Sequence, residues 1–193
     1  MLTTLPNIKA RLGLPDADTQ YDTLLTSVIA AVSARFDLEC NRTFARTENA
    51  IQEFSAEETE IPVACYPIEA LTGFETKSSE ALGWVQVDNV DAVIRLGCVV
   101  SISSTLGSAR QQARLVYTGG YGLPGAEVSP GQTALPPDLQ HAAIEQVAVW
   151  FQNKDKLGLL RHWPSSGTYV LLSQQPLLPG VTAVLKKYER WRA

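Results

Sequence analysis

The sequence is poor in the residues that most enzymes use at their active sites. It contains only two histidines, His141 and His162, and we expect both to be surface residues without a catalytic or metal-binding task. It lacks the Gly-x-Ser-x-Gly elbow of hydrolases, the Gly-Lys-Ser/Thr phosphate loop and the dinucleotide-binding glycine fingerprint. These absences argue against an enzyme, and the sequence predicts no cofactor and no metal ion.

Cysteine and long apolar runs are also scarce. The three cysteines, Cys40, Cys65 and Cys98, have no spacing typical of metal ligands, and no secretory signal is recognisable. We therefore expect reduced thiols that serve as packing residues. No apolar run reaches the roughly 18 residues that cross a bilayer, so no membrane partner is expected. The protein is expected to be made in a cytoplasm and to act there or in something assembled there.

Basic residues are too few for a typical DNA-binding domain. The 193-residue chain has a net charge of −4, whereas a sequence-specific DNA binder usually carries a basic surface. The charge is unevenly distributed, because residues 16–60 carry −7 and residues 181–193 carry +3. Two different surfaces are indicated, one of which meets an acidic partner. The alternative is a solvated helix face with lysine stems lying on apolar surface.

Helical periodicity predicts three main helices. The first spans about 18–40, and its apolar residues recur at helical spacing: Tyr21, Leu24, Leu25, Val28, Ile29, Val32 and Phe36. The second spans about 137–153, with Pro137 at the first helical position, where its missing N–H has no cost. The third spans about 181–191, and a short helix over 4–13 ends at Gly13.

Residues 48–121 have the alternating pattern of short strands. The predicted strands are Ile51–Phe54, Glu60–Val63, Ile68–Thr76, Trp84–Val87, Val90–Leu96 and Arg114–Thr118. Asp88 and Asn89 are predicted to form a hairpin turn between the fourth and fifth of these strands. We interpret residues 100–112 as a flexible loop and Gly119-Gly120 as a turn or bulge.

The C-terminal third is irregular and contains aromatic residues that the core does not require. Interfaces favour Trp, Tyr and Arg. Trp163, Tyr169, Leu171 and Leu172 are therefore candidate subunit-interface residues. The candidate docking residues in the last helix are Val181, Val184, Leu185, Lys186, Lys187, Tyr188, Arg190, Trp191 and Arg192. The alternative is that these side chains cover the domain's own underside.

Four pieces of the chain, taken in order, resemble the head–tail connector (adaptor, head-completion) proteins of long-tailed double-stranded DNA phages. They are Leu12-Gly13-Leu14-Pro15-Asp16 with the helix leading to Asn41-Arg42-Thr43-Phe44, Tyr66-Pro67-Ile68-Glu69-Ala70-Leu71, Val116-Tyr117-Thr118-Gly119-Gly120-Tyr121 with Leu135-Pro136-Pro137-Asp138-Leu139-Gln140-His141-Ala142, and Leu178-Pro179-Gly180-Val181 before a helix with Tyr188 and Trp191. Together they span nearly the whole chain, and their order and spacing carry the resemblance.

The resemblance implies an α+β fold in which an antiparallel helix bundle carries an inserted small antiparallel β subdomain. Residues 1–193 would form a single connector domain. Its helical core would comprise residues 1–47 and 135–155, and residues 48–121 would form the β insertion. Residues 156–193 would form an irregular C-terminal arm ending in the docking helix.

The resemblance also implies a structural virion protein at the head–tail junction, assembled in the host cytoplasm. It would form a homo-oligomeric ring, typically of twelve subunits, beneath the portal protein. The docking residues would reach the portal, and the opposite surface would receive a tail-side stopper or tail-completion protein. DNA would pass through the lumen without specific binding, and an acidic chain fits such a conduit.

Three alternatives stay open on the sequence alone. One is a tail-completion or terminator protein on the tail side of the connector, which also forms rings but often of six. Another is a small enzyme with an unrecognised site. The last is a regulatory binding module, which would be monomeric or dimeric and would bind DNA or a peptide.

Overall fold

The structure, a computed structural model, describes residues 1–127, 129–156 and 177–190. The chain forms two compact units. Unit 1 comprises Met1–Cys40 with Pro136–Tyr188, and unit 2 comprises Asn41–Leu135 with Glu189–Ala193. The chain therefore leaves unit 1 after its second helix, builds unit 2, and returns to unit 1 for its remaining helices.

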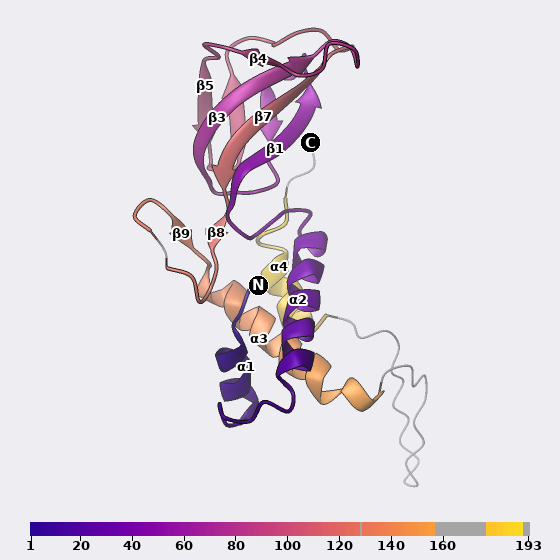
Figure 1. Cartoon of the computed structure of the whole chain (residues 1–193), viewed down its shortest axis with the longest axis vertical. Coiled ribbons are helices and arrows are strands. Elements are labelled where there is room, and N and C mark those ends of the chain that lie inside the picture. The colour runs from indigo at the N-terminus through magenta and orange to yellow at the C-terminus, as the bar shows by residue number, and fades with distance from the viewer. Residues whose placement is uncertain (128, 157–176, 191–193) are drawn as a thin grey trace. The chain divides into compact units, whose positions relative to one another are not determined.

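Unit 1 is helical. It contains α1 (Leu5–Leu12), α2 (Asp22–Glu39), α3 (Pro137–Gln152), the 3-10 turn η1 (Lys154–Lys156) and α4 (Pro179–Leu185) (Figure 1). The helix α3 is central, because α1, α2 and α4 all pack against it. Its buried face includes Leu139, Ala143 and Val147. No helix among the described residues has both the length and the apolar character needed to cross a membrane.

A buried lysine fixes the turn between α1 and α2. Lys9 is only 4% exposed, and its Nζ donates to the carbonyl oxygens of Asp16 at 3.0 Å and Asp18 at 2.7 Å. The same ammonium pairs with Asp22 Oδ1 at 2.7 Å. A buried charge is costly unless it is paired and hydrogen-bonded, so these contacts hold the acidic turn against α1.

Unit 2 is built from antiparallel sheets. One sheet has the strand order β1-β7-β3-β4, and its strands are Thr47–Ser55, Gln112–Gly119, Ile68–Lys77 and Val85–Val87 in that order. The second sheet has the order β2-β6-β5, with strands Glu60–Pro62, Val99–Ile102 and Ala92–Arg95. A short parallel pair, β8 (Tyr121–Gly122) and β9 (Thr133–Ala134), follows β7 (Figure 1).

The two larger sheets bury a common apolar core. Its members are Ile61, Val63, Cys65, Phe74, Val100, Ile102, Leu115 and Tyr117. The hydroxyl of Tyr117 accepts a hydrogen bond from the backbone N–H of Cys65 at 2.9 Å. Burial raises the pKa of Tyr117, so the phenol stays neutral in this core.

Three chain segments cross at Gly119 and Gly120. A Cβ on Gly119 would lie 2.5 Å from the carbonyl oxygen of Cys65, and one on Gly120 would lie 2.6 Å from that of Ala45. Gly120 also has a φ of 101°, a conformation that other residues rarely adopt. The backbone of Tyr121 bonds to the residues on either side of Ala45. Its N–H donates to Phe44 O at 2.8 Å, and its carbonyl oxygen accepts from Arg46 N at 2.9 Å.

A buried arginine lies beside this crossing. Arg42 is 4% exposed, and its guanidinium carbon lies 3.3 Å from the ring centroid of Tyr66, 4.6 Å from that of Phe44 and 5.3 Å from that of Tyr121. One of its Nη atoms donates to the carbonyl oxygen of Tyr66. The aromatic faces replace part of the hydration that the cation loses on burial.

The predicted fold class is wrong. The chain is not a helix bundle with a small β insertion, because it contains about 30% helix and 29% strand, mostly in antiparallel sheets. The physical reason is that unit 2 has two sheets that bury each other's apolar faces around their own core. It does not need the helices to cover it.

Individual elements also differ from the predictions. The loop predicted over 100–112 is wrong at both ends, because residues 99–102 form β6, the central strand of the second sheet, and β7 begins at Gln112. The predicted hairpin at Asp88-Asn89 is wrong, because β4 pairs with β3 whereas β5 pairs with β6. The tight turn lies instead at Leu96-Gly97, where both φ angles are positive and Cys98 N donates to Arg95 O at 3.2 Å. The last helix ends at Leu185, earlier than predicted.

The crossing gives a direct stability prediction. We expect Gly120→Ala to destabilise the protein by about 3 kcal/mol or more, because the new Cβ meets backbone atoms at a positive φ. The matched control is Gly73→Ala in β3, where nothing lies within 4 Å of a Cβ, so its effect should stay within about 0.5 kcal/mol. Urea unfolding followed by circular dichroism measures both. Equal stabilities for the two variants would contradict this account of the crossing.

Candidate functional site

The described residues hold no group of three or more His, Cys, Asp or Glu side chains that would bind a metal ion. His141 is exposed on α3, with its Nε2 at 3.8 Å from Glu145 Oε1 one turn later, a proximity that the sequence analysis overlooked. His162 lies outside the described residues. In the acidic run near β2, Glu60 Oε1 pairs with Arg95 Nη1 of β5 at 2.5 Å.

The candidate docking helix packs into unit 1. In α4, Val181 and Leu185 are buried, with 3% and 4% of their surfaces exposed, and Val184 is half-buried. The Cys40 thiol, at the end of α2, lies 3.5 Å from the carbonyl oxygen of Leu185. Gln146, fully buried in α3, accepts the N–H of Leu178 at 2.9 Å. These contacts hold α4 within unit 1.

The residues after α4 divide between exposed and bonded side chains. Lys186 and Lys187 are exposed. The Tyr188 hydroxyl donates to Asp138 Oδ1, at the start of α3, at 2.7 Å, and Lys187 Nζ is 4.0 Å from the other oxygen of this carboxylate. These contacts hold the chain after α4 against the N-terminal turn of α3.

Arg190 is bound within unit 2. Its Nη2 donates to the carbonyl oxygen of Pro62 at 2.6 Å and lies 3.4 Å from Gln52 Oε1. The Arg190 side chain therefore contacts both β1 and β2 within unit 2. Among the candidate docking residues that the structure describes, Lys186 and Lys187 are the exposed cations.

Six candidate residues lie outside the part of the chain that the structure describes. They are the four candidate subunit-interface residues and two of the candidate docking residues: Trp163, Tyr169, Leu171, Leu172, Trp191 and Arg192. Trp84 is described and lies immediately before β4. The guanidinium carbon of Arg114, on β7, lies 4.5 Å from the centroid of the Trp84 ring.

A groove that the sequence analysis did not predict runs between α3 and α4. It encloses about 500 Å³. It is lined by Asp138, His141, Ala142, Glu145, Leu178, Pro179, Gly180, Val181 and Val184. Arg11 of α1 forms two hydrogen bonds with Glu145, at 2.7 and 3.0 Å, and this contact lowers the pKa of the carboxyl group. The Glu145 carboxylate is therefore ionised and paired with Arg11.

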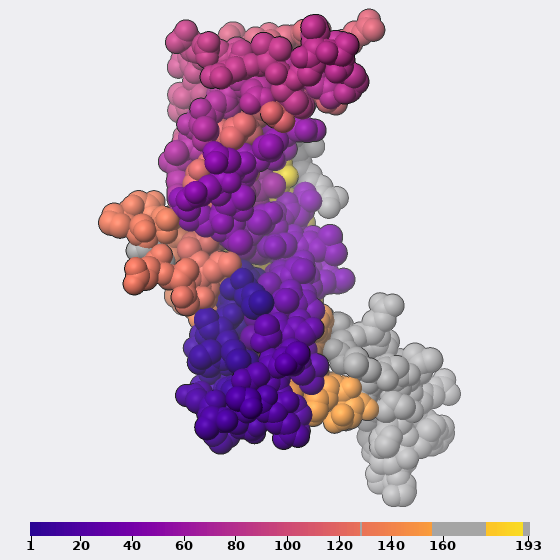
Figure 2. Space-filling view, viewed as in Figure 1, coloured from indigo at the N-terminus to yellow at the C-terminus, as the bar shows by residue number. Residues whose placement is uncertain are grey.

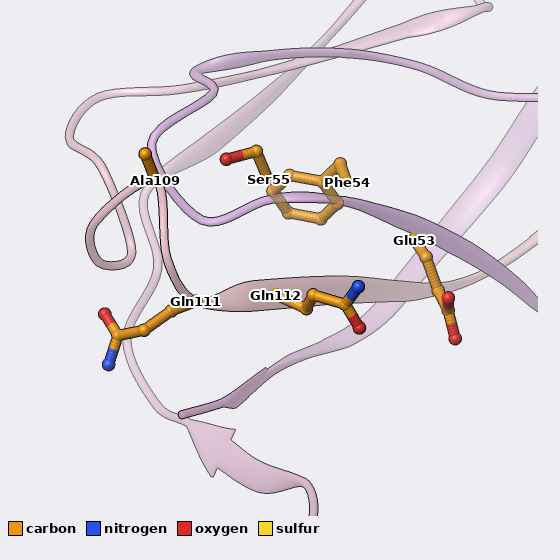
Figure 3. A pocket seen from close by; sticks show the side chains of 6 residues that line it. All are labelled: Glu53, Phe54, Ser55, Ala109, Gln111 and Gln112. Carbon is orange, nitrogen blue, oxygen red and sulfur yellow. The ribbon is translucent and has the colours of Figure 1, made fainter. Parts of the chain in front are cut away.

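A second hollow, of about 330 Å³, lies in unit 2 where β1 ends and β7 begins (Figure 3). Phe54 and Ser55 come from β1, and Gln111 and Gln112 come from the facing segment. Gln111 is already engaged, because its Oε1 accepts the N–H of Ser108 at 2.9 Å. The only ionisable group in the lining is the carboxylate of Glu53, so the hollow offers no paired acid and base.

Comparison with known proteins identifies a similar fold but no family. No family model matches the sequence, and no curated protein matches it. Among solved structures, the chain is similar to one described as the neck of an empty GTA particle computed with C6 symmetry, GTA being a gene transfer agent, a phage-like particle. The TM-score is 0.60 and the identity 15%, over 97% of this chain and 89% of that chain. The chain therefore has the fold of a protein from a phage-like neck.

Proposed function

We propose that this protein is a structural component of a virion neck. It forms a ring that joins the portal vertex of a phage-type capsid to the tail, and DNA passes through the lumen of the ring. The observation that carries the proposal is the shared fold, which extends over 97% of the chain and therefore includes both units. The resemblance in sequence pattern to head–tail connectors supports the same conclusion independently.

The charge distribution supports a conduit rather than a DNA-binding protein. The chain carries a net charge of −4, and Arg42, Arg46 and Arg114 are engaged with aromatic rings or carboxylates. Nonspecific binding to DNA depends on cations that neutralise phosphates. A ring of such subunits would let the genome pass without holding it.

We further propose that the portal meets the exposed cations after α4. Lys186 and Lys187 are the candidates, since Val181 and Leu185 are buried and Arg190 is bound to Pro62. The basic character of residues 181–193 fits an acidic surface on the portal.

The second candidate is a tail-completion ring on the tail side of the connector. The sixfold symmetry in the description of the similar structure keeps this candidate open, because rings of six and of twelve both satisfy it. A connector should number twelve copies and bind the portal. A tail-side ring should number six and ignore the portal.

Native mass spectrometry of the full-length protein, alone and mixed with the portal of its own virus, tests the proposal. We expect either a twelve-subunit ring or a smaller species that joins the portal twelvefold. A six-subunit ring that ignores the portal would favour the tail-side candidate. A monomer that ignores the portal would contradict both.

Charge reversal tests the docking surface separately. Lys186→Glu and Lys187→Glu should each weaken portal binding by about tenfold and reduce its dependence on salt, because each removes a cation from a contact in which opposite charges meet. Arg110→Glu is the matched control, since Arg110 is exposed on a loop of unit 2 and the charge change is the same. Binding is measured by biolayer interferometry on immobilised portal. Equal affinities for all three variants would reject this docking surface.

A DNA-binding assay separates the conduit from the regulatory-module alternative. Fluorescence anisotropy with a 30-base-pair duplex at about 0.15 M salt should show no binding at micromolar protein, because the chain carries a net charge of −4. Saturable binding that persists at this salt concentration would favour the regulatory module.

A further inference from the structure

The turn that carries Lys186 and Lys187 is ordered by backbone hydrogen bonds beyond the end of α4. The helix ends at Leu185. Beyond it, the N–H groups of Lys187 and Tyr188 each donate to the carbonyl oxygen three residues earlier, at 3.0 and 2.9 Å. Both lysine side chains are exposed. A single turn after a seven-residue helix has little stability of its own, so contacts with the rest of unit 1 must hold it.

One carboxylate, that of Asp138 at the start of α3, receives two side chains from this turn. Its Oδ1 accepts the hydroxyl of Tyr188 at 2.7 Å, and its Oδ2 lies 4.0 Å from Lys187 Nζ. The same Oδ1 accepts the backbone N–H of Leu139 at 2.9 Å. A carboxylate in the first turn of a helix interacts favourably with the helix dipole, but that effect does not require a tyrosine 50 positions later in the chain. Asp138 therefore joins the turn to α3.

The helix α4 has contacts of its own at both ends. At its start, Gln146 accepts the N–H of Leu178 at 2.9 Å, and at its end the Cys40 thiol lies 3.5 Å from the carbonyl oxygen of Leu185. Figure 2 shows α2, in purple, in front of α4, which it largely hides. These contacts fix the helix, whereas the tyrosine–carboxylate bond fixes the turn beyond it. Loss of that bond should therefore loosen the lysines without releasing α4.

We propose that Tyr188 and Asp138 are positioning residues of the portal-docking surface, which hold Lys186 and Lys187 in the conformation that the portal binds. Ordering a loop and its long side chains on contact costs binding free energy, so a turn that is ordered beforehand binds more tightly. The charge of Asp138 acts in the opposite direction, because an anion beside the lysines weakens their attraction for an acidic partner. The inference rests on the proposed docking surface and names residues that act on it through the lysines.

Removal of the tyrosine hydroxyl tests the coupling between the two positioning residues. Tyr188→Phe should weaken portal binding by about fivefold, because the turn loses its anchor. In the Asp138→Ala background the same substitution should leave the affinity unchanged, since the hydroxyl has already lost its acceptor. Tyr21→Phe is the matched control and should bind like the wild type, because Tyr21 is also a half-buried tyrosine of unit 1. Biolayer interferometry on immobilised portal measures these affinities. Equal losses in both backgrounds would mean that the hydroxyl contacts the portal itself and would overturn the proposal.

A charge-matched pair of variants separates position from charge. Asp138→Asn and Asp138→Ala both lack the anion, but only the asparagine keeps an oxygen that accepts the tyrosine hydroxyl. Asp138→Asn should therefore bind the portal about fivefold more tightly than Asp138→Ala. The salt dependence of binding should be the same for Tyr188→Phe and the wild type, because both lysines remain, whereas Lys187→Glu should reduce it. Equal affinities for the two Asp138 variants would overturn the proposal.

Hydrogen exchange of the free full-length protein tests the anchor without the portal. Mass spectrometry of peptides that contain residues 186–188 should show exchange at least about threefold faster in Tyr188→Phe than in the wild type, because the turn opens more often. Peptides from α4 should keep their wild-type rates, since the contacts of Leu178 and Leu185 remain. Unchanged exchange in the turn would overturn the proposal. Equally faster exchange in α4 would also overturn it, by giving the bond a role in the stability of unit 1 instead.

The portal measurements separate failure of this inference from failure of the proposed function. If Lys186→Glu and Lys187→Glu weaken portal binding but Tyr188→Phe does not, the docking surface stands and the positioning role is rejected. If the lysine variants also bind like the wild type, the docking surface is rejected and the positioning role with it. A wild-type protein that ignores the portal would contradict the connector function as well.

Discussion

The arrangement of unit 2 depends on the close backbone approach at Gly119 and Gly120. Side chains at these positions would collide with the carbonyl groups of Cys65 and Ala45. Because they are absent, the end of β7 can bond to the segments before β1 and before β3: Tyr121 N donates to Phe44 O, and Gly120 N donates to Pro67 O, each at less than 3 Å. The same approach lets the Tyr117 hydroxyl reach Cys65 N in the core. The Gly119-Gly120 dipeptide thus lets residues 44–46, before β1, bond to the chain that follows β7, an inner strand of its sheet.

The sequence predicted the helices better than the sheets, for a physical reason. The long helix over 18–40 and the helix over 137–153 correspond to α2 and α3, because a periodic apolar face is a local signal. Strand partners depend on contacts distant in sequence. The alternation within Val99–Ile102 was too short to distinguish a strand from a loop, and its place in the centre of a sheet comes from β2 and β5 on either side. Asp88-Asn89 has the composition of a hairpin turn, yet the adjoining strands belong to different sheets.

The candidate site follows the same division. Composition identified the basic, aromatic end of the chain as unusual. It did not indicate that Arg190 would bind Pro62 or that Tyr188 would bind Asp138, because both partners lie more than 45 positions away. The α3–α4 groove was also invisible in the sequence, since its lining joins residues of two helices that are distant in the chain.

Buried cations and exposed leucines differ in whether they find partners within the subunit. Lys9 and Arg42, the most deeply buried cations that the structure describes, have partners inside their own unit. Two leucines, in contrast, have no such burial: Leu38 of α2 is 71% exposed and Leu96 at the β5–β6 turn is 96% exposed. Leaving such side chains in water forfeits roughly 1.5–3 kcal/mol each relative to burial. Lys9 and Arg42 are thus paired within one subunit, whereas Leu38 and Leu96 would gain free energy only from burial against another molecule, as the proposed neck assembly would allow.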